Sequence, residues 1–198
     1  MIKNLNQIII WLVVFLGCLM ASEGANSESG ECVTASVPLL GGGSLQFSIP
    51  KQMIPKIVDN FFTVTTDFPG FGEQENLGTR ARSVFLIVQT RPKSSTLALD
   101  VVNGSKANLR ELPMQGGYRV FIEPMRSTGV VKTYFLFKDV HGNLVVVTDP
   151  GSWSRSYSWE HSYPEGYEIR AEIDKRYGDD FRSIDERIEN LVNSMMQR

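Results

Sequence analysis

Apolar residues alternate with polar or small ones over several short segments, which is the pattern of a strand with one buried face. The pattern predicts strands over residues 33–39, 44–49, 61–67, 97–101, 118–122 and 167–173. The run Val84–Val88 is apolar without alternation, which predicts a central strand covered on both faces. Residues 130–138 and 144–148 flank a turn in which Gly142 can adopt the positive φ of a hairpin loop.

The last part of the chain has helical spacing instead. Ser183 and Glu186 are spaced like the two partners of a capping box at a helix start. One apolar stripe follows at helical intervals and consists of Ile184, Ile188, Leu191, Val192 and Met195. The polar face holds Asp185, Glu186, Arg187, Glu189 and Asn190. Residues 167–177 also fit a helix capped by Gly178, although the strand is the preferred interpretation.

These elements predict the fold class α+β. We expect a mostly antiparallel β-sheet with the C-terminal amphipathic helix packed on it. The hydrophobic fraction of 42 % and the charged fraction of 21 % are sufficient for a folded core and argue against disorder over most of the chain.

Residues 1–24 have the three-part plan of a secretory signal peptide. A short polar head with Lys3 precedes the apolar run Ile8–Met20, and small polar residues follow. The run is shorter than the ~20 residues that cross a bilayer as a helix. Cleavage after Gly24 leaves a flexible leader, residues 25–31, and a single β-rich domain, residues 32–198.

Other kinds of processing remain open. Cleavage after Ala21 also fits, and an uncleaved anchor is a further alternative. Lipidation at Cys18 is favoured by the small Gly17 before it, but Leu16 is bulky where a small residue is usual. We therefore predict a periplasmic protein that is attached to the membrane only if Cys18 is lipidated.

Export leaves Cys32 as the one cysteine of the mature chain, which excludes an internal disulfide. The preferred interpretation is a tolerated small hydrophobe. A disulfide-linked dimer or a reactive thiol is the alternative.

Composition and motifs exclude several function classes. The net charge of −2 argues against a nucleic-acid binder, whose surface is strongly basic. The two histidines and two cysteines are not clustered, which argues against a zinc site. The sequence contains no phosphate-binding loop, no dinucleotide fingerprint and no nucleophile elbow. We predict no enzyme activity, no catalytic residues, no cofactor and no metal. The alternative is a hydrolase whose site is assembled around His161 from distant residues.

Four aromatic residues lie within one short segment, residues 153–163, directly after the turn at Pro150. In a strand, the odd-numbered side chains share one face, and the arginine and histidine on that face argue against full burial. Rings interleaved with Arg, His and Ser are typical of binding surfaces, although an aromatic strand packed on the sheet is the competing interpretation. The candidate partner-binding residues are Trp153, Arg155, Tyr157, Trp159, His161 and Tyr163.

A second candidate surface is the loop Phe68–Glu73, which is rich in Pro and Gly. Phe68 and Phe71 either fold under this loop as anchors or protrude toward a partner. We include both in the predicted partner-binding set.

Four short patches resemble small periplasmic immunity proteins that protect bacteria against lipase-type effectors of type VI secretion. The patches are Phe47–Lys51, Thr66–Phe71, Ser83–Gln89 and Ser183–Met195. The resemblance implies a non-enzymatic, exported protein that binds a secreted toxin and blocks its active site, and it carries over no site residue. The alternative function is an exported module that binds a glycan, lipid or cell-wall ligand through its aromatic surface.

Overall fold

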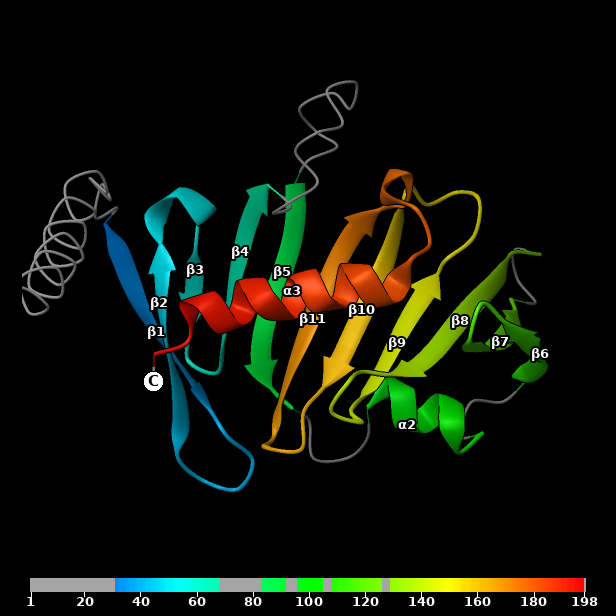
Figure 1. Ribbon diagram of the computed structural model, residues 1–198, viewed down its shortest axis with the longest axis horizontal. Coiled ribbons are helices and arrows are strands. Elements are labelled where there is room, and N and C mark those ends of the chain that lie inside the picture. The colour runs from blue at the N-terminus through cyan, green and yellow to red at the C-terminus, as the bar shows by residue number, and fades with distance from the viewer. Residues whose placement is uncertain (1–30, 68–82, 92–95, 105–107, 126–128, 198) are drawn as a thin grey trace, which may run out of the picture. The chain divides into compact units, whose positions relative to one another are not determined.

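Antiparallel strands form most of the structure, as the alternating pattern predicts (Figure 1). The computed structural model describes residues 31–67, 83–91, 96–104, 108–125 and 129–197. The chain divides into the units Met1–Glu31 and Cys32–Arg198, and every described strand and helix lies in the second. The predicted signal peptide, nearly all of the leader and the loop with Phe68 and Phe71 lie outside the described residues.

Nine of the described strands form one sheet in the order β3-β4-β5-β11-β10-β9-β8-β7-β6, and every neighbouring pair is antiparallel. Their bounds are β3 (Lys56–Val58), β4 (Phe61–Asp67), β5 (Ser83–Thr90), β6 (Arg110–Gln115), β7 (Tyr118–Pro124), β8 (Val131–Lys138), β9 (Leu144–Asp149), β10 (Ser156–Ser162) and β11 (Tyr167–Asp174). A separate hairpin consists of β1 (Cys32–Pro38) and β2 (Ser44–Pro50). Short 3-10 turns follow β2 and β11, at Lys51–Met53 and Lys175–Tyr177.

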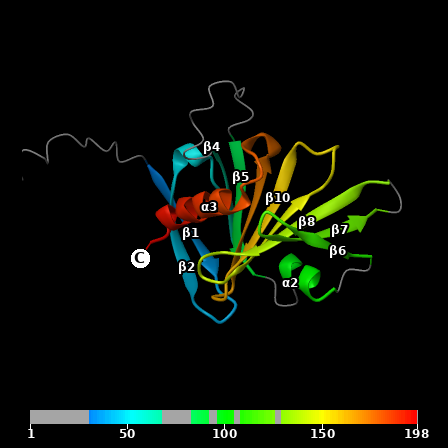
Figure 2. The ribbon, with the colours of Figure 1, turned by 45° about the vertical axis from the view of Figure 1, so that its right-hand side comes forward.

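The helix α3 (Phe181–Met195) crosses one face of the sheet over β5, β11 and β10 (Figure 1). It buries its predicted apolar stripe together with Phe181, so the predicted fold class is confirmed. The β1–β2 hairpin lies beside α3 and joins the same core through Phe47 and Ile49 (Figure 2). The chain end is tied to this hairpin, since the backbone N–H of Gln197 donates to the carbonyl of Gln46 at 2.8 Å.

The opposite face of the sheet is covered in part by α2 (Leu97–Val102), where we expected a strand. That expectation is wrong because Ala98 and Val101, three residues apart, are the buried positions, whereas Leu99 is half exposed. Thr96 caps the helix by accepting a hydrogen bond from the N–H of Leu99 at 3.2 Å. The helix packs on a second core cluster made by Phe121, Tyr134, Leu136 and Val146.

Three further expectations can be compared with the structure. The β8–β9 hairpin is confirmed, with Gly142 at φ 87°. The expectation that the strand at Val84–Val88 is covered on both faces is wrong, because Phe85 points outward and is 39 % exposed. The capping box is also wrong, since α3 begins two residues before Ser183. The cap is Asp180, whose Oδ1 accepts from the N–H of Ser183 at 3.3 Å.

Candidate functional site

The predicted aromatic face of β10 exists, but much of it lies in the core. Trp159, His161 and Tyr163 are only 2 %, 1 % and 5 % exposed beneath α3. Tyr157 is half-buried and meets Phe181 edge-on, with 5.1 Å between ring centroids. The expectation that a histidine keeps this face open is wrong, because buried carboxylates accompany it. Trp159, His161 and Tyr163 are therefore not on the accessible surface.

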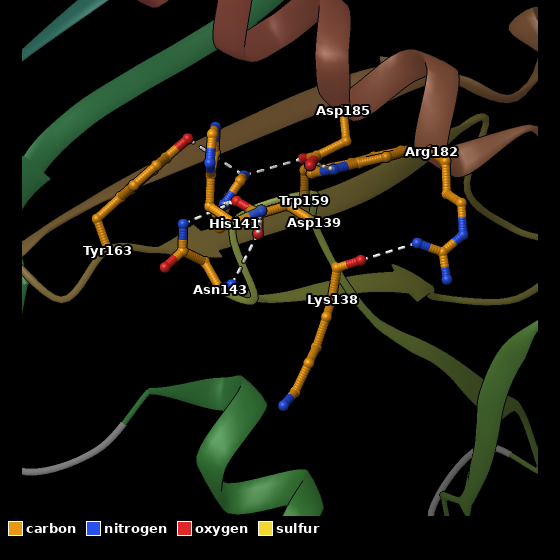
Figure 3. Close-up of polar contacts among 9 residues, drawn as sticks. Lys138, Asp139, His141, Asn143, Trp159, Tyr163, Arg182 and Asp185 are labelled. Carbon is orange, nitrogen blue, oxygen red and sulfur yellow. Dashed lines mark hydrogen bonds and ion pairs between the residues drawn. The ribbon is translucent and has the colours of Figure 1, made fainter.

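Asp139, His161 and Asp185 form a buried group that we call the Asp–His–Asp cluster, and Figure 3 labels its two aspartates. The Nε2 atom of His161 lies 3.1 Å from Oδ2 of Asp139, and its Nδ1 atom lies 3.2 Å from Oδ1 of Asp185. The indole N–H of Trp159 donates to the same Asp185 oxygen at 3.0 Å. The cluster therefore joins β10, the β8–β9 turn and α3.

Neither aspartate of this cluster was predicted as a site residue. Asp139 opens the β8–β9 turn and accepts hydrogen bonds from the N–H of His141 at 2.9 Å and from the N–H and side-chain amide of Asn143, both at 2.7 Å. Asp185 was expected on the polar face of the last helix, but it is 2 % exposed. Its position next to Ile184 and Ile188 in the helical repeat is the signal that was available.

The neighbouring carboxylates favour the charged form of His161 despite its burial. Burial favours the neutral ring, but the hydrogen bond to Asp185 and the charges of Asp185, Asp139 and Glu189 raise the pKa of His161 above its ordinary 6.5. Burial likewise opposes ionisation of Asp139, yet hydrogen bonds from Asn143 and the charge of His161 hold its pKa below 3.8. In its protonated form, His161 donates one hydrogen bond to each aspartate.

Two tyrosine rings continue the cluster into the core. The rings of His161 and Tyr163 stack with centroids 4.2 Å apart, and those of Tyr163 and Tyr167 stack at 4.4 Å. Burial raises the pKa of both tyrosines, so they remain neutral at every physiological pH. A cationic ring over an aromatic face adds a favourable electrostatic contact.

The contacts of the Asp–His–Asp cluster indicate a structural role. A general base needs a nitrogen lone pair within reach of a proton, but both nitrogens of His161 face carboxylates and the side chain is buried. His141 lies in the β8–β9 turn and is exposed. In the part of the chain that the structure describes, no group of three His, Cys, Asp or Glu side chains is placed to hold a metal ion.

The even-numbered side chains of β10 lie on its other face and include a second polar network, which the odd-numbered aromatic pattern does not predict. Glu160 accepts a hydrogen bond from the N–H of Leu97 at 2.7 Å and so holds the start of α2. Burial, together with the charge of Glu168, raises the pKa of Glu160. Arg170 lies between the two carboxylates, 3.4 Å from Glu160 and 2.8 Å from Glu168. The register pairs Glu160 with Arg170 across the strands.

The exposed end of the aromatic segment is the loop of residues 150–155, which we call the Trp153 loop. Trp153 is 68 % exposed, and Arg155 is exposed too. Lys175 supports the loop from beneath: its Nζ donates to Oδ1 of Asp149 at 2.5 Å and to the carbonyl of Gly151 at 2.8 Å. Its backbone N–H also donates to the carbonyl of Arg155 at 2.9 Å.

The loop requires glycine at its second position. Gly151 has φ 108°, and an added Cβ would lie 2.8 Å from Cγ1 of Val130. Its N–H donates to Oδ1 of Asp149 at 2.8 Å, and its carbonyl accepts from the N–H of Ser154 at 3.2 Å. The loop is therefore fixed by its own backbone before any partner binds.

A positively charged hollow lies where the Trp153 loop meets β11. Its volume is about 520 Å³, and its lining includes the cations of Arg155, Lys175 and Arg176. Asp174 also lines the hollow and neutralises Arg176, with 2.9 Å between Nη2 and Oδ2, and Lys175 is paired with Asp149 at 2.5 Å. Arg155 has no carboxylate within ion-pair distance among residues 31–67, 83–91, 96–104, 108–125 and 129–197. The hollow therefore presents net positive charge beside an exposed indole.

The remaining predicted residues divide into two groups. Phe68, Phe71 and Cys18 lie outside the described residues. Cys32 is exposed at the start of β1. Among the helices that the structure describes, none has the length and apolar character to cross a membrane.

No protein-family model and no curated protein matches the chain. The comparison with solved structures does find similar chains. An immunity protein of the type IV secretion system of Stenotrophomonas maltophilia superposes with a TM-score of 0.52 at 8 % identity, over 88 % of this chain and 98 % of that chain. The iron-regulated outer membrane lipoprotein FrpD of Neisseria meningitidis gives a TM-score of 0.49 at 10 % identity, over 83 % of this chain and 93 % of its own.

Proposed function

We propose that this chain is an exported, non-enzymatic protein-binding domain, and most concretely an immunity or inhibitor protein that covers the active site of a secreted bacterial toxin. The observation that carries the proposal is the Trp153 loop, with an indole that is 68 % exposed on a rigid backbone. Tryptophan and arginine supply a disproportionate share of the energy of protein interfaces. Trp153 and Arg155 are therefore the residues that we assign to partner binding.

The rigidity of the loop supports the same function. A flexible loop loses conformational freedom when it binds, and that loss weakens the complex. Lys175 and Gly151 already hold the Trp153 loop in one conformation, so little further ordering is required. The cationic hollow beside the loop favours a partner whose contact surface is acidic. A stable interface of this kind buries about 1,600 Å² in total.

The fold likeness supports a binding role, because one protein with this fold is an immunity protein of a type IV secretion system. The patches resembling immunity proteins of type VI systems point to the same general role with a different class of effector. The chemistry of His161 supports a protein without catalysis, since both of its ring nitrogens face aspartates. We propose action in the periplasm after removal of residues 1–24, with attachment through Cys18 as the alternative.

The experiment is a titration of the purified protein, measured by isothermal calorimetry, with secreted toxins sought among the products of the neighbouring genes. Trp153→Ala should weaken binding by about thirtyfold or more, the loss expected for a central interface tryptophan. Arg155→Ala should weaken it by a smaller factor. The matched control is Met114→Ala, which removes an equally exposed apolar side chain (69 % exposed) from β6 and should leave affinity unchanged.

Two results would contradict the proposal. In the first, Trp153→Ala binds the toxin as tightly as the unaltered protein does. In the second, no toxin binds, while muropeptides or other glycans raise the melting temperature and Trp153→Ala removes that shift. The second result would favour a module for cell-wall ligands.

A further inference from the structure

A second hollow lies at the opposite end of β9 from the Trp153 loop. It forms where the tip of the β8–β9 hairpin meets the end of α2 and the start of α3. Its volume is about 560 Å³, and pockets for small molecules range from about 300 to 1,000 Å³. The apolar part of its lining consists of Val102, Leu136, Phe137 and Leu144. Leu136 and Leu144 belong to the cluster beneath α2 and form the floor with Val102, whereas Phe137, the next residue along β8, packs in the core on the other face of the sheet.

Three cations also line this hollow, and two of them are not neutralised. Arg119 pairs with Glu111 at 2.9 Å. Lys138 and Arg182, in contrast, have no carboxylate within ion-pair distance in the described part of the chain. Positive charge therefore remains beside the apolar floor, where a ligand with an anionic group would be attracted.

Arg182 is held in place by contacts that leave its charge unpaired. Its guanidinium lies 5.0 Å from the ring centroid of Phe137 and 5.7 Å from that of Tyr118. Its Nη1 donates to the carbonyl of Lys138 at 2.8 Å (Figure 3). Figure 3 also shows the Lys138 side chain extending away from the Asp–His–Asp cluster, on the side of α2. Both cations thus belong to the rim of the same hollow.

We propose that this hollow binds a small amphipathic anion, whose apolar body lies on the floor and whose anionic head group meets Lys138 and Arg182. Burial of the apolar body supplies affinity in proportion to the area removed from water. Hydrogen bonds from the two cations to the head group are charge-assisted and supply selectivity for an anion. The inference does not depend on the proposed toxin partner, because the two surfaces lie at opposite ends of β9.

The neighbouring charges favour a small ligand over an extended acidic partner. A small depression next to the hollow shares Phe137 and Arg182 with it. That depression also contains the carboxylates of Asp139, Asp185, Glu186 and Glu189. An acidic protein surface spanning both depressions would meet these like charges, whereas a small anion that stays inside the hollow would not.

The probe is laurate, used below its critical micelle concentration and measured by isothermal calorimetry on the purified protein. We expect saturable binding of one laurate per chain. Dodecyl maltoside has an alkyl chain of similar length on an uncharged sugar head group and should bind at least about tenfold more weakly. Lys138→Gln should weaken laurate binding about threefold and Lys138→Glu about tenfold, the effect of losing and then reversing one exposed charge.

Two further variants separate charge from shape. Val102→Trp fills the hollow from the end of α2 and should abolish laurate binding without altering the core. Lys56→Glu makes the same charge change on the exposed surface of β3 and should leave laurate binding unchanged. The proposal is overturned if laurate shows no saturable binding, if dodecyl maltoside binds as tightly, or if Lys138→Glu and Val102→Trp both bind laurate normally.

Discussion

At the scale of single residues, the most consequential feature is a buried histidine that lies between two aspartates. His161 is 1 % exposed, and each of its ring nitrogens faces an aspartate. Removing one partner of a buried ion pair leaves an uncompensated charge, which costs about 3–5 kcal/mol. The Asp–His–Asp cluster therefore ties the start of α3 to the β8–β9 turn, and His161 can donate to both aspartates at once only while it is protonated.

This dependence predicts how stability changes with pH. The folded pKa of His161 is raised above 6.5, so its contribution to stability is complete below pH 6.5 and is lost as the pH rises through the folded pKa. The pKa of Glu189 is raised as well, through burial, so its contribution is also lost with rising pH, beginning near 4.5. The pKa of Asp139 is lowered, so its contribution to stability is complete above pH 3.8 and is lost as the pH falls through the folded pKa. Urea denaturation should therefore give a free energy of unfolding that falls from pH 6.5 upward.

The variant His161→Ala isolates the histidine part of this profile. At pH 6 it should lower the free energy of unfolding by about 3–5 kcal/mol, and it should remove the decline above pH 6.5. His141→Ala changes the exposed histidine of the β8–β9 turn and should alter stability by less than about 0.5 kcal/mol. An identical decline above pH 6.5 in His161→Ala and in the unaltered protein would show that His161 is not its cause.

At the scale of elements, the strands were predictable because their signal is local. Alternation in β2 and β11 marks one buried face, and the structure buries that face. The residues of α2 include apolar side chains two apart, which favour a strand, and three apart, which favour a helix. The local sequence does not decide between these two structures. Contacts with β9 and the hydrogen bond from Leu97 to Glu160 decide in favour of the helix.

The candidate site was only partly predictable for the same reason. Trp153 and His161 are noticeable in the sequence because they interrupt a polar segment with large or titratable side chains. His161 is buried and Trp153 is exposed, and both outcomes depend on residues distant in sequence. Asp185 on α3 lies within hydrogen-bond distance of the buried His161, whereas Lys175 holds the loop in which Trp153 is exposed. Asp185 sits in a stretch of alternating charges, and its position beside the apolar stripe of Ile184 and Ile188 is the one local sign that it is buried.

The start of α3 provides a test at this scale. Asp180 caps the helix, so Asp180→Ala should lower the free energy of unfolding by about 1 kcal/mol, as expected for an N-cap. Ser183 lies inside the first turn, so Ser183→Ala should have a much smaller effect in thermal or urea denaturation. A larger loss of stability in Ser183→Ala than in Asp180→Ala would instead support a capping box formed by Ser183 and Glu186.

At the scale of the whole molecule, the sheet separates two surfaces of different character. The Trp153 loop presents an exposed indole and arginine at one end of β9. The hollow of Lys138 and Arg182 combines an apolar floor with unpaired positive charge at the other end. Because the sheet and α3 hold both in place, a small ligand in the hollow should not compete with a protein partner on the loop.

The central claim, that this protein binds its partner through the Trp153 loop, is tested most directly by amide hydrogen exchange with and without the bound toxin. Binding should slow exchange at residues 150–155 and at the neighbouring Lys175–Tyr177 turn, because the interface excludes water from them. Exchange in the edge strand β6, which carries the control residue Met114, should not change. Slowed exchange confined to β6, β3 or the β1–β2 hairpin, with residues 150–155 unaffected, would contradict the claim.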